Sequence, residues 1–431
     1  MINIAVWGGA GEHGRSSYFI QKDRLRVLLD CGVKKEGAGQ YPAVDAQEAA
    51  ALDAVFLSHA HEDHSMAIPL LYKLGYRGLV WTTRATAEQL PGYFAAWKKY
   101  VVSRSAELPY GEEHIDSIRF AFLEERVDAG EWLTITPSLK VMWGRSGHLA
   151  GSVWLLLDMD GSLVFFSGDY SRESCLLAAD WPELAGRQVE LAIVDAACGM
   201  DEESQELKLS RLQETVAETA ARGGTVLLPV PVYGRGQDLL VWLRETFPQL
   251  PVIAEADILG ALERMLAWPD WLRPQAERCI REVLADGLVR EVRDREERER
   301  LIGETGPRVI LTSDGMMQSA KAQWYYRELS RNPAAASVVL TGHLAAGSFG
   351  DALLKSKSAD GCRAELIRYK VHQGIRDVRE MLDAVDSKET LLVHAGKAST
   401  DLAAAHLAQL GYKGIHSLEC GDRLVTGGRG R

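Results

Sequence analysis

One short segment, Val55–His64, limits what this chain can be more than any other feature. It begins with the apolar run Val55-Phe-Leu, which is typical of a buried strand. Four potential metal ligands follow within six residues: His59, His61, Asp63 and His64. Because side chains alternate along extended backbone, His59 and His61 point the same way. Imidazole and carboxylate groups suit zinc, so the segment predicts a metal site at a strand end.

Three further candidate ligands stand singly at the ends of predicted strands. They are His148, Asp169 and His394, each close to glycines that let backbone pass near a site. Together with the first segment they complete a ligand set for two divalent ions about 3.5–4 Å apart, which would share a hydroxide and clamp a phosphoryl group. This set predicts hydrolysis of a phosphodiester or of a carbonyl compound.

The pattern of predicted elements changes twice along the 431 residues, which are too many for one core of typical size. Residues 1–203 have short strands joined by turns. Residues 204–358 alternate helix and strand, which predicts a parallel sheet with its own core, and Ile258–Arg300 within them is expected to be helical. From residue 359 to 431 the first pattern returns, beginning with a strand at Glu365–Val371. We therefore predict one α/β domain interrupted by an inserted α/β domain.

Charge, cysteine content and apolar runs argue against several classes of protein. The net charge of -11 argues against binding nucleic acid through bulk positive charge, although metal ions and a local basic groove can supply the field that a nuclease needs. The six cysteines are scattered without a C-x-x-C pair, so they indicate neither a disulfide framework nor a cysteine zinc site. The N-terminus lacks the features of a signal peptide, and no apolar run reaches membrane-spanning length. We expect a cytoplasmic protein without membrane association.

The segment Ser58-His-Ala-His-Glu-Asp-His64 resembles the H-x-H-x-D-H signature of the metallo-β-lactamase superfamily. Asp30, His148 and Asp169 resemble further motifs of that family. The resemblance implies an αββα sandwich that holds two Zn²⁺. The implied ligands are His59, His61 and His148 for one ion and Asp63, His64 and His394 for the other, with Asp169 bridging. Asp30 would orient a ligand histidine.

The predicted insertion resembles that of the β-CASP branch, whose members process nucleic acid and include RNase J and the endonuclease of the pre-mRNA 3′-end cleavage complex. The segments that carry this likeness are Leu191–Asp195, Leu228–Leu240, Leu311–Ala320, Val371-His372 and Leu392–His394. The resemblance implies that His372, paired with Asp195, protonates the leaving 3′-oxygen. The implied catalytic residues are Asp30, Asp63, Asp195 and His372. The implied substrate contacts are Arg235, Ser313, Gly315, Met316 and Ser319.

Four positions depart from the pattern of that branch. Asp257 stands in a segment where an Asp-Ser-Pro turn is usual, and His343 stands where an aromatic residue is common. Asp314 replaces a proline or glycine, and a carboxylate there would repel phosphate. Gly374 replaces an acidic residue two positions after His372. These departures leave the predicted metal ligands intact and bear on how substrate is held.

The leading hypothesis is a zinc-dependent nuclease that cleaves RNA, single-stranded in our expectation, with hydroxide held by two zinc ions and a histidine as general acid. A hydrolase of small esters, thioesters or lactones is the first alternative, and the large insertion together with His372 argues against it. A non-catalytic RNA-processing subunit is the second, and the complete ligand set argues against that. DNA in place of RNA, endo or exo mode, and a homodimer all stay open.

Overall fold

The computed structural model describes residues 1–184, 186–356 and 361–427. The chain forms two compact units, each with its own core. Their bounds are Met1–Arg172, Ala179–Glu202 and His372–Arg431 for the first unit, and Glu173–Ala178 and Glu203–Val371 for the second. The boundary predicted between residues 358 and 359 lies outside the described residues.

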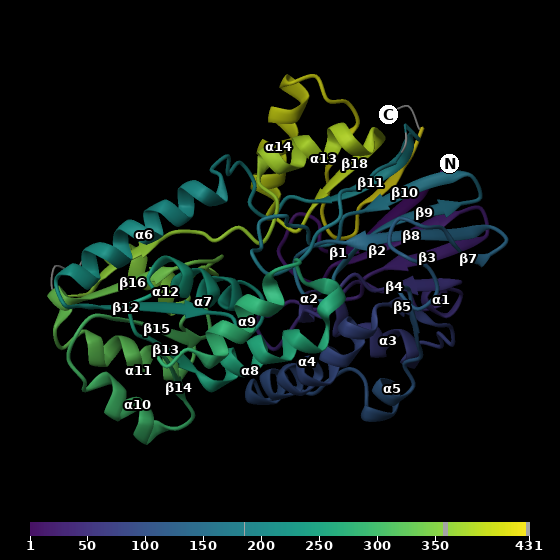
Figure 1. The fold of residues 1–431 in the computed structure, drawn as a ribbon. Coiled ribbons are helices and arrows are strands. Elements are labelled where there is room, and N and C mark those ends of the chain that lie inside the picture. The colour runs from purple at the N-terminus through teal and green to yellow at the C-terminus, as the bar shows by residue number, and fades with distance from the viewer. Residues whose placement is uncertain (185, 357–360, 428–431) are drawn as a thin grey trace. The chain divides into compact units, whose positions relative to one another are not determined.

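Two seven-stranded sheets form the first unit (Figure 1). Across one sheet the order is β20 (Arg423–Val425), β1 (Asn3–Gly8), β2 (Ser17–Lys22), β3 (Leu25–Leu29), β4 (Ala54–Phe56), β5 (Val80–Thr82) and β6 (Phe120–Phe122). Across the other it is β19 (Ile415–Ser417), β18 (Ser387–Val393), β11 (Val189–Asp195), β10 (Ser162–Phe166), β9 (Val153–Met159), β8 (Leu139–Arg145) and β7 (Leu133–Thr136). Strands β3 to β6 are parallel neighbours, and so are β10, β11, β18 and β19.

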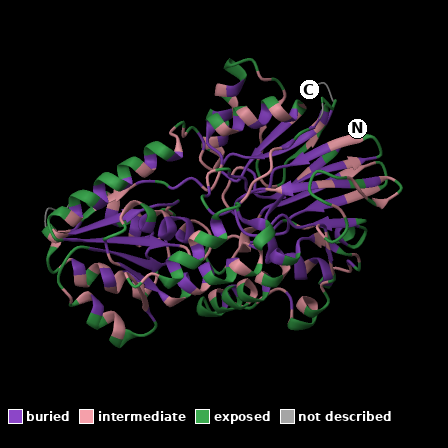
Figure 2. Cartoon of the chain, in the orientation of Figure 1, coloured by how far each residue is buried: buried purple, intermediate pink, exposed green. Residues whose placement is uncertain are grey.

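Helices cover the outer face of each sheet, and the inner faces meet. Phe19 of β2 belongs to a core cluster with residues of α1 (Ala46–Ala50), α3 (Ile68–Lys73) and α4 (Arg84–Ser103), whereas its neighbour Tyr18 contacts Phe166 of β10 with 5.7 Å between ring centroids. Phe165, on the other side of β10, packs with Ile375 of α13 (Ile375–Val385). Both faces of each sheet are therefore buried, as the purple strands of Figure 2 show, and the predicted αββα sandwich is confirmed.

The helices of this unit differ widely in length. They are α1 (Ala46–Ala50), α2 (Glu62–Ser65), α3 (Ile68–Lys73), α4 (Arg84–Ser103), α5 (Glu112–Asp116), α13 (Ile375–Val385) and α14 (Lys397–Gln409). Asp45 caps α1 by accepting the backbone N–H groups of Gln47 and Glu48. The shortest helix, α2, carries two of the candidate ligands.

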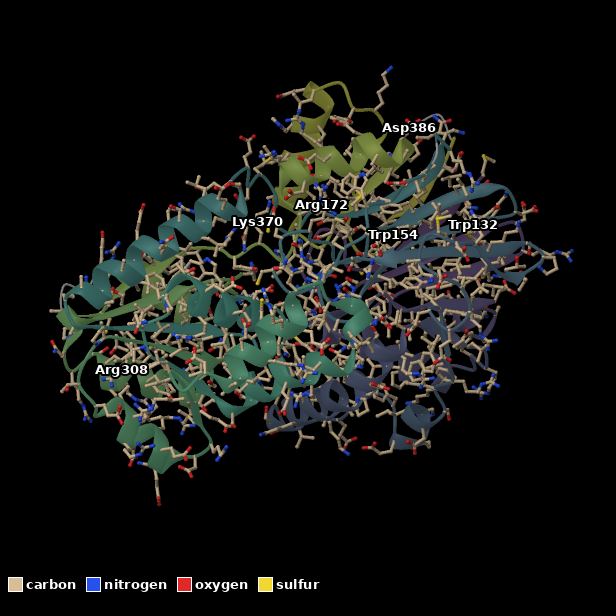
Figure 3. The ribbon with its side chains drawn as sticks, in the orientation of Figure 1. Trp132, Trp154, Arg172, Arg308, Lys370 and Asp386 are labelled. Atoms are coloured by element: carbon tan, nitrogen blue, oxygen red, sulfur yellow. The ribbon has the colours of Figure 1, made fainter. Side chains whose placement is uncertain are left out.

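A six-stranded parallel sheet forms the second unit. Its order is β14 (Val289–Val292), β13 (Val252–Glu255), β15 (Arg308–Ser313), β12 (Thr225–Val230), β16 (Ala336–Leu340) and β17 (Arg363–Leu366). Its helices are α6 (Gln205–Ala221), α7 (Arg235–Thr246), α8 (Ala256–Arg264), α9 (Ala276–Ala285), α10 (Arg295–Ile302), α11 (Ala320–Leu329) and α12 (Phe349–Lys355), with 3₁₀ turns at Met265–Ala267, Pro269–Trp271 and Pro333–Ala335. Arg308 (Figure 3) donates to the Leu301 carbonyl at 3.0 Å and to Thr225 Oγ1 at 3.2 Å, which ties α10 to the sheet.

Two elements differ from the sequence prediction. The strand predicted at Glu365–Val371 shares only Glu365 and Leu366 with β17, and the residues after Leu366 are not in a strand. β17 pairs with β16 of the second unit, because an apolar run alone does not tell which sheet a strand joins. The helix predicted over Ile258–Arg300 is broken by 3₁₀ turns around Pro269 and by β14, since proline cannot continue a helix. No helix among the described residues has both the length and the apolar character needed to cross a membrane.

Gly32 provides a test of how the loop that follows β3 packs. A Cβ atom there would lie 1.8 Å from the carbonyl oxygen of Asp63 and 2.4 Å from the backbone nitrogen of His64. We expect Gly32→Ala to push these residues apart and to lower the free energy of unfolding by about 1–3 kcal/mol. Gly92→Ala is the matched control, because Gly92 is exposed in α4 with nothing near its Cβ position, and it should stabilise by about 0.5–1 kcal/mol. Urea unfolding of both variants measures the difference, and equal stability would contradict this packing.

Candidate metal centre

All seven candidate ligands lie at one edge of the first unit, where its strands end. His59 and His61 follow β4, and α2 begins directly after them. His148, Asp169 and His394 follow β8, β10 and β18. The loop after each strand is free to turn its side chains toward the same point, while the strand fixes where the loop begins. The structure thus brings together every residue for which the sequence predicts a metal-binding role.

His59, His61, His148 and Asp169 form the first group, with their ligand atoms all within 4.8 Å of one another. His61 Nδ1 lies 3.1 Å from both His59 Nε2 and His148 Nε2. Nitrogen atoms bound to one tetrahedral zinc ion are about 3.3 Å apart, given Zn–N bonds of about 2.0–2.1 Å. The donor atoms and their spacing therefore fit a zinc ion.

Asp63, His64 and His394 form the second group. His394 Nε2 lies 3.1 Å from Asp63 Oδ2, and His64 Nε2 lies 3.8 Å from the same oxygen. Asp169 contacts both groups, because its Oδ2 is 3.5 Å from His59 Nε2 and its Oδ1 is 3.3 Å from His64 Nε2. One carboxylate therefore stands between two sets of ligands, which is the arrangement that a pair of metal ions requires.

Asp30 and Ser58 hold two of these imidazoles in orientation. His64 Nδ1 donates to Asp30 Oδ2 at 2.7 Å, and the same carboxylate accepts the N–H and the hydroxyl of Ser58 at 2.7 Å each. With its hydroxyl proton given to Asp30, Ser58 accepts from His59 Nδ1 at 3.0 Å. Both histidines can therefore bind a metal ion through Nε2. Residues that hydrogen-bond a ligand histidine in this way fix its tautomer and its ring orientation. The sequence predicts this role for Asp30 but gives no signal for Ser58.

His372 lies beside the two groups and pairs with Asp195. Its Nδ1 donates to Asp195 Oδ2 at 3.1 Å and stands 3.8 Å from Asp169 Oδ2. Its ring stacks on that of His394 with 5.0 Å between centroids. Asp195 is buried and also accepts the backbone N–H groups of Tyr170 at 3.2 Å and Ala197 at 2.9 Å. His372 is therefore held by one nitrogen, with its Nε2 left for another partner.

Four residues of this edge, Asp169, Asp195, His372 and His394, also satisfy the distance criterion for a metal group of their own. The hydrogen bonds argue against a metal ion there. The carboxylate of Asp195 already accepts four donors, and the Nδ1 of His372 is one of them. We therefore treat His372 and Asp195 as a hydrogen-bonded pair.

Burial and the local charges move the pKa values of the cluster in opposite directions. Burial, aided by His64, lowers the pKa of His59 well below its ordinary value. Burial also acts to lower the pKa of His394, but Asp169 and Asp63 outweigh it and raise that pKa to about 9. Without metal ions the acidic side chains thus keep protons on some imidazoles, which marks a site built to hold positive charge.

The second unit gathers its own candidate residues at the carboxyl ends of β12, β15 and β16. Arg235 begins α7, and its Nε donates to Thr341 Oγ1 at 3.2 Å. Its guanidinium passes so close to Gly315 and Gly342 that a Cβ atom would lie 2.7 Å and 2.0 Å from its Nη2. The carboxyl edge of a parallel sheet is where such folds bind ligands. Thr341 and Gly342 are members of this group that the sequence does not single out.

Asp314 occupies the backbone donors of the loop after β15. Its carboxylate accepts the N–H of Met316 at 3.1 Å and the N–H of Ser319, which also caps α11. Successive amides of this kind commonly bind an anion, so here the protein supplies the anion itself. The φ of Asp314 is 80°, in the left-handed region that favours glycine.

Two other departures have local explanations. Gly374 starts α13, and a Cβ atom there would lie 2.1 Å from the carbonyl oxygen of Asp201, so no acidic side chain fits. Asp257 pairs with Lys321 at 3.1 Å.

The candidate metal centre also contains aromatic contacts that sequence patterns do not reveal, since they join residues distant along the chain. Tyr93 of α4 meets the ring of His61 at 5.8 Å, and His13 meets that of His394 at 6.0 Å.

Comparisons with known proteins agree with this geometry. Residues 10–184 match the family model for the metallo-β-lactamase superfamily. Transcription termination factor FttA of Methanothermobacter thermautotrophicus is 30% identical, and the alignment covers 93% of this chain and 68% of that protein. The chain belongs to the metallo-β-lactamase superfamily, in its β-CASP branch. An RNase J-like protein of Methanocaldococcus jannaschii is 25% identical, with 94% of this chain and 95% of that protein aligned.

The match to this β-CASP family extends through both units. A crystal structure of a protein of unknown function from Enterococcus faecalis superposes with a TM-score of 0.61 at 12% identity, covering 98% of this chain and 99% of that one, which shows the fold alone. The chain spans 57% of the FttA of Methanocaldococcus jannaschii. Family and cluster together make the chain a metal-dependent hydrolase.

Loading of divalent ions onto the metal-free protein should release protons. Because the raised pKa of about 9 keeps His394 protonated at neutral pH, while a metal ligand must be deprotonated, metal ions and protons compete. We expect the affinity for Zn²⁺ to increase from pH 7 to about pH 9 as this proton is lost. Titration of the chelator-treated protein in weak buffer, with a pH indicator, measures the protons released. Binding without proton release between pH 7 and 8 would contradict the protonated state of His394.

Proposed function

We propose that the protein is a zinc-dependent nuclease that hydrolyses phosphodiester bonds of RNA. The observation that carries this proposal is His372, an imidazole held by Asp195 at 3.1 Å directly beside the shared carboxylate of the two ligand groups. Cleavage of a phosphodiester expels an alkoxide that needs a proton, and a positioned imidazole supplies one at neutral pH. The name of the RNase J-like relative supports RNA as the substrate class.

In this proposal the two ligand groups hold two Zn²⁺. His59, His61 and His148 would hold one ion, Asp63, His64 and His394 the other, and Asp169 both. Bound there, the ions would supply a nucleophile at neutral pH and stabilise negative charge on the phosphoryl oxygens. The spacing of the histidine nitrogens supports zinc, and Asp30 supports the second group by fixing His64.

The remaining steps belong to the chain's own side chains. Asp195 fixes the His372 tautomer by accepting from Nδ1, so the proton carried by Nε2 is the one available to a leaving 3′-oxygen. His372 is partly exposed, with 18% of its side chain accessible, so a substrate oxygen can reach it.

Binding of the RNA strand is proposed for the carboxyl edge of the second unit's sheet. Arg235 would contact a phosphate, with Ser313, Gly315, Met316 and Ser319 forming the loop beside it. Arginine suits this role because its planar guanidinium matches phosphate oxygens. No disulfide joins the chain's six cysteines, all of which lie among the described residues, and this supports the proposed cytoplasmic location.

His372→Ala tests the proposal directly. We expect RNA cleavage to fall about 10²–10⁴-fold, because general acid catalysis contributes that much, while zinc content stays the same. The measurement follows 5′-labelled single-stranded RNA, the same sequence as DNA, and a panel of thioesters and lactones, each with and without chelator.

His406→Ala is the matched control, since it removes an imidazole from α14 and should leave cleavage unchanged. Cleavage of esters without cleavage of RNA would overturn the nuclease assignment. An unchanged rate in His372→Ala would remove this residue from the mechanism. Loss of zinc from that variant would make His372 a ligand.

Asp314→Gly is expected to bind RNA more tightly. The change frees the N–H groups of Met316 and Ser319, removes a negative charge and places glycine at a left-handed φ. Asp314→Asn, which keeps an acceptor oxygen but not the charge, should give a smaller gain. Fluorescence anisotropy with a short RNA measures both affinities, and weaker or unchanged binding in Asp314→Gly would show that this loop does not face phosphate.

A further inference from the structure

A second cluster of basic side chains lies in the first unit, away from the candidate metal centre. An open pocket of about 500 Å³ is lined by residues that end α3, form α5 and precede β5 and β6. Its lining comprises Tyr72, Lys73, Arg77, Glu113, His114, Ser117 and Arg119. A volume of this size is in the range of pockets that bind small molecules.

The pocket lies at the opposite edge of the sheet from the metal ligands. Arg77 and Arg119 stand before β5 and β6, at the amino ends of parallel strands, whereas His59 follows the carboxyl end of β4. Helix α3 leads from the ligand segment back to this edge and ends at Lys73. The pocket is therefore a separate site of the first unit, which the proposed cleavage chemistry does not use.

Three cations face this pocket without a carboxylate partner among the described residues. Within the described part of the chain, no acidic oxygen lies within ion-pair distance of Lys73, Arg77 or Arg119, although Glu113 also lines the pocket. Lys98 of α4, in contrast, pairs with Glu112 of α5. In a chain of net charge -11, a group of uncompensated cations is a local exception that favours an anion.

Backbone contacts hold three of the pocket's side chains in place, and in the first of them Lys73 Nζ donates to the carbonyl oxygen of Pro109 at 2.5 Å. Arg77 Nη1 donates to the carbonyl oxygens of Tyr72 at 2.8 Å and Tyr76 at 2.7 Å, which leaves its Nε and Nη2 for a ligand. His114 Nδ1 accepts the N–H of Gly111 at 3.0 Å, so the proton of the neutral ring is on Nε2. The hydroxyl of Ser117 adds a further donor to the lining.

We propose that this pocket binds a phosphate group. Two guanidinium groups and an ammonium group match the charge and the several oxygens of phosphate better than the two oxygens of a carboxylate. The phosphate could belong to the backbone of an RNA strand, a source that rests on the proposed nuclease function, or to a free phosphate ester or inorganic phosphate. The chemistry of recognition is the same for both sources.

The first arm of the test titrates inorganic phosphate into the zinc-loaded protein by calorimetry. Arg77→Ala/Arg119→Ala should weaken binding about tenfold or more, because the charge-assisted hydrogen bonds to the phosphate are removed. Arg24→Ala, an exposed arginine outside the lining, is the matched control and should change nothing. Arg119→Gln alone is the second variant, since its side chain forms no hydrogen bond or ion pair with a described residue, and thermal unfolding verifies that each variant is folded.

The second arm measures the affinity for single-stranded RNA at several salt concentrations, with all proteins carrying His372→Ala to slow cleavage. If the source is RNA backbone, the slope of log K against log salt should decrease by about 0.7 for each phosphate that the pocket no longer neutralises. An unchanged slope together with abolished phosphate binding assigns the pocket to a free phosphate group. Phosphate affinity that is equal in the double variant and the unaltered protein overturns the proposal. Cleavage by the unaltered protein is scored separately, so a protein that cleaves no RNA but binds phosphate here refutes only the nuclease function.

Discussion

The carboxylate of Asp169 is the contact on which the candidate site depends. One of its oxygens lies 3.5 Å from His59, His148 and His394, and the other lies 3.3 Å from His64. Only 3% of its side chain is exposed, so its charge acts at low dielectric on every imidazole around it. It opposes burial at His59, His64 and His394 alike. Asp63 adds to this effect at His64 and His394, whose pKa values are raised, whereas burial and the charge of His64 outweigh it at His59, whose pKa is lowered.

The sandwich explains how such a carboxylate reaches both ligand groups. His59 to His64 follow a strand of one sheet, whereas His148, Asp169 and His394 follow strands of the other. Within each sheet the ligand-bearing strands end at a common edge, and the packing of Tyr18 on Phe166 brings the two inner faces together. The ligands therefore meet because two sheets pack, which no single segment of the chain could achieve.

This division also sets what the sequence could predict. The spacing of His59, His61, Asp63 and His64 is a local pattern, so it could be interpreted without a fold. His148, Asp169 and His394 stand alone in sequence, so their positions at predicted strand ends make them candidates, and the resemblance to a family implies which ion each would hold. Ser58 and Tyr93 contact ligand histidines in the folded protein, and the residue types serine and tyrosine alone do not predict such contacts. The strand predicted at Glu365–Val371 is assigned to the first domain, whereas β17 pairs with β16 of the second unit, because the partner of a strand is set by tertiary packing.

The distribution of carboxylates determines where on this acidic chain an anion would meet uncompensated positive charge. In the second unit, the carboxylate of Asp314 already accepts the backbone N–H groups of Met316 and Ser319. These two N–H groups are therefore not available to a phosphate. At the amino edge of the first unit's parallel strands, Arg77 and Arg119 face a pocket in which no carboxylate pairs with them among the described residues. With so large an excess of negative charge, a phosphate is repelled wherever acidic groups stand unneutralised. A phosphate is therefore attracted to the few places where cations outnumber acidic groups. In this chain the positions of individual side chains determine those places, and the net charge does not.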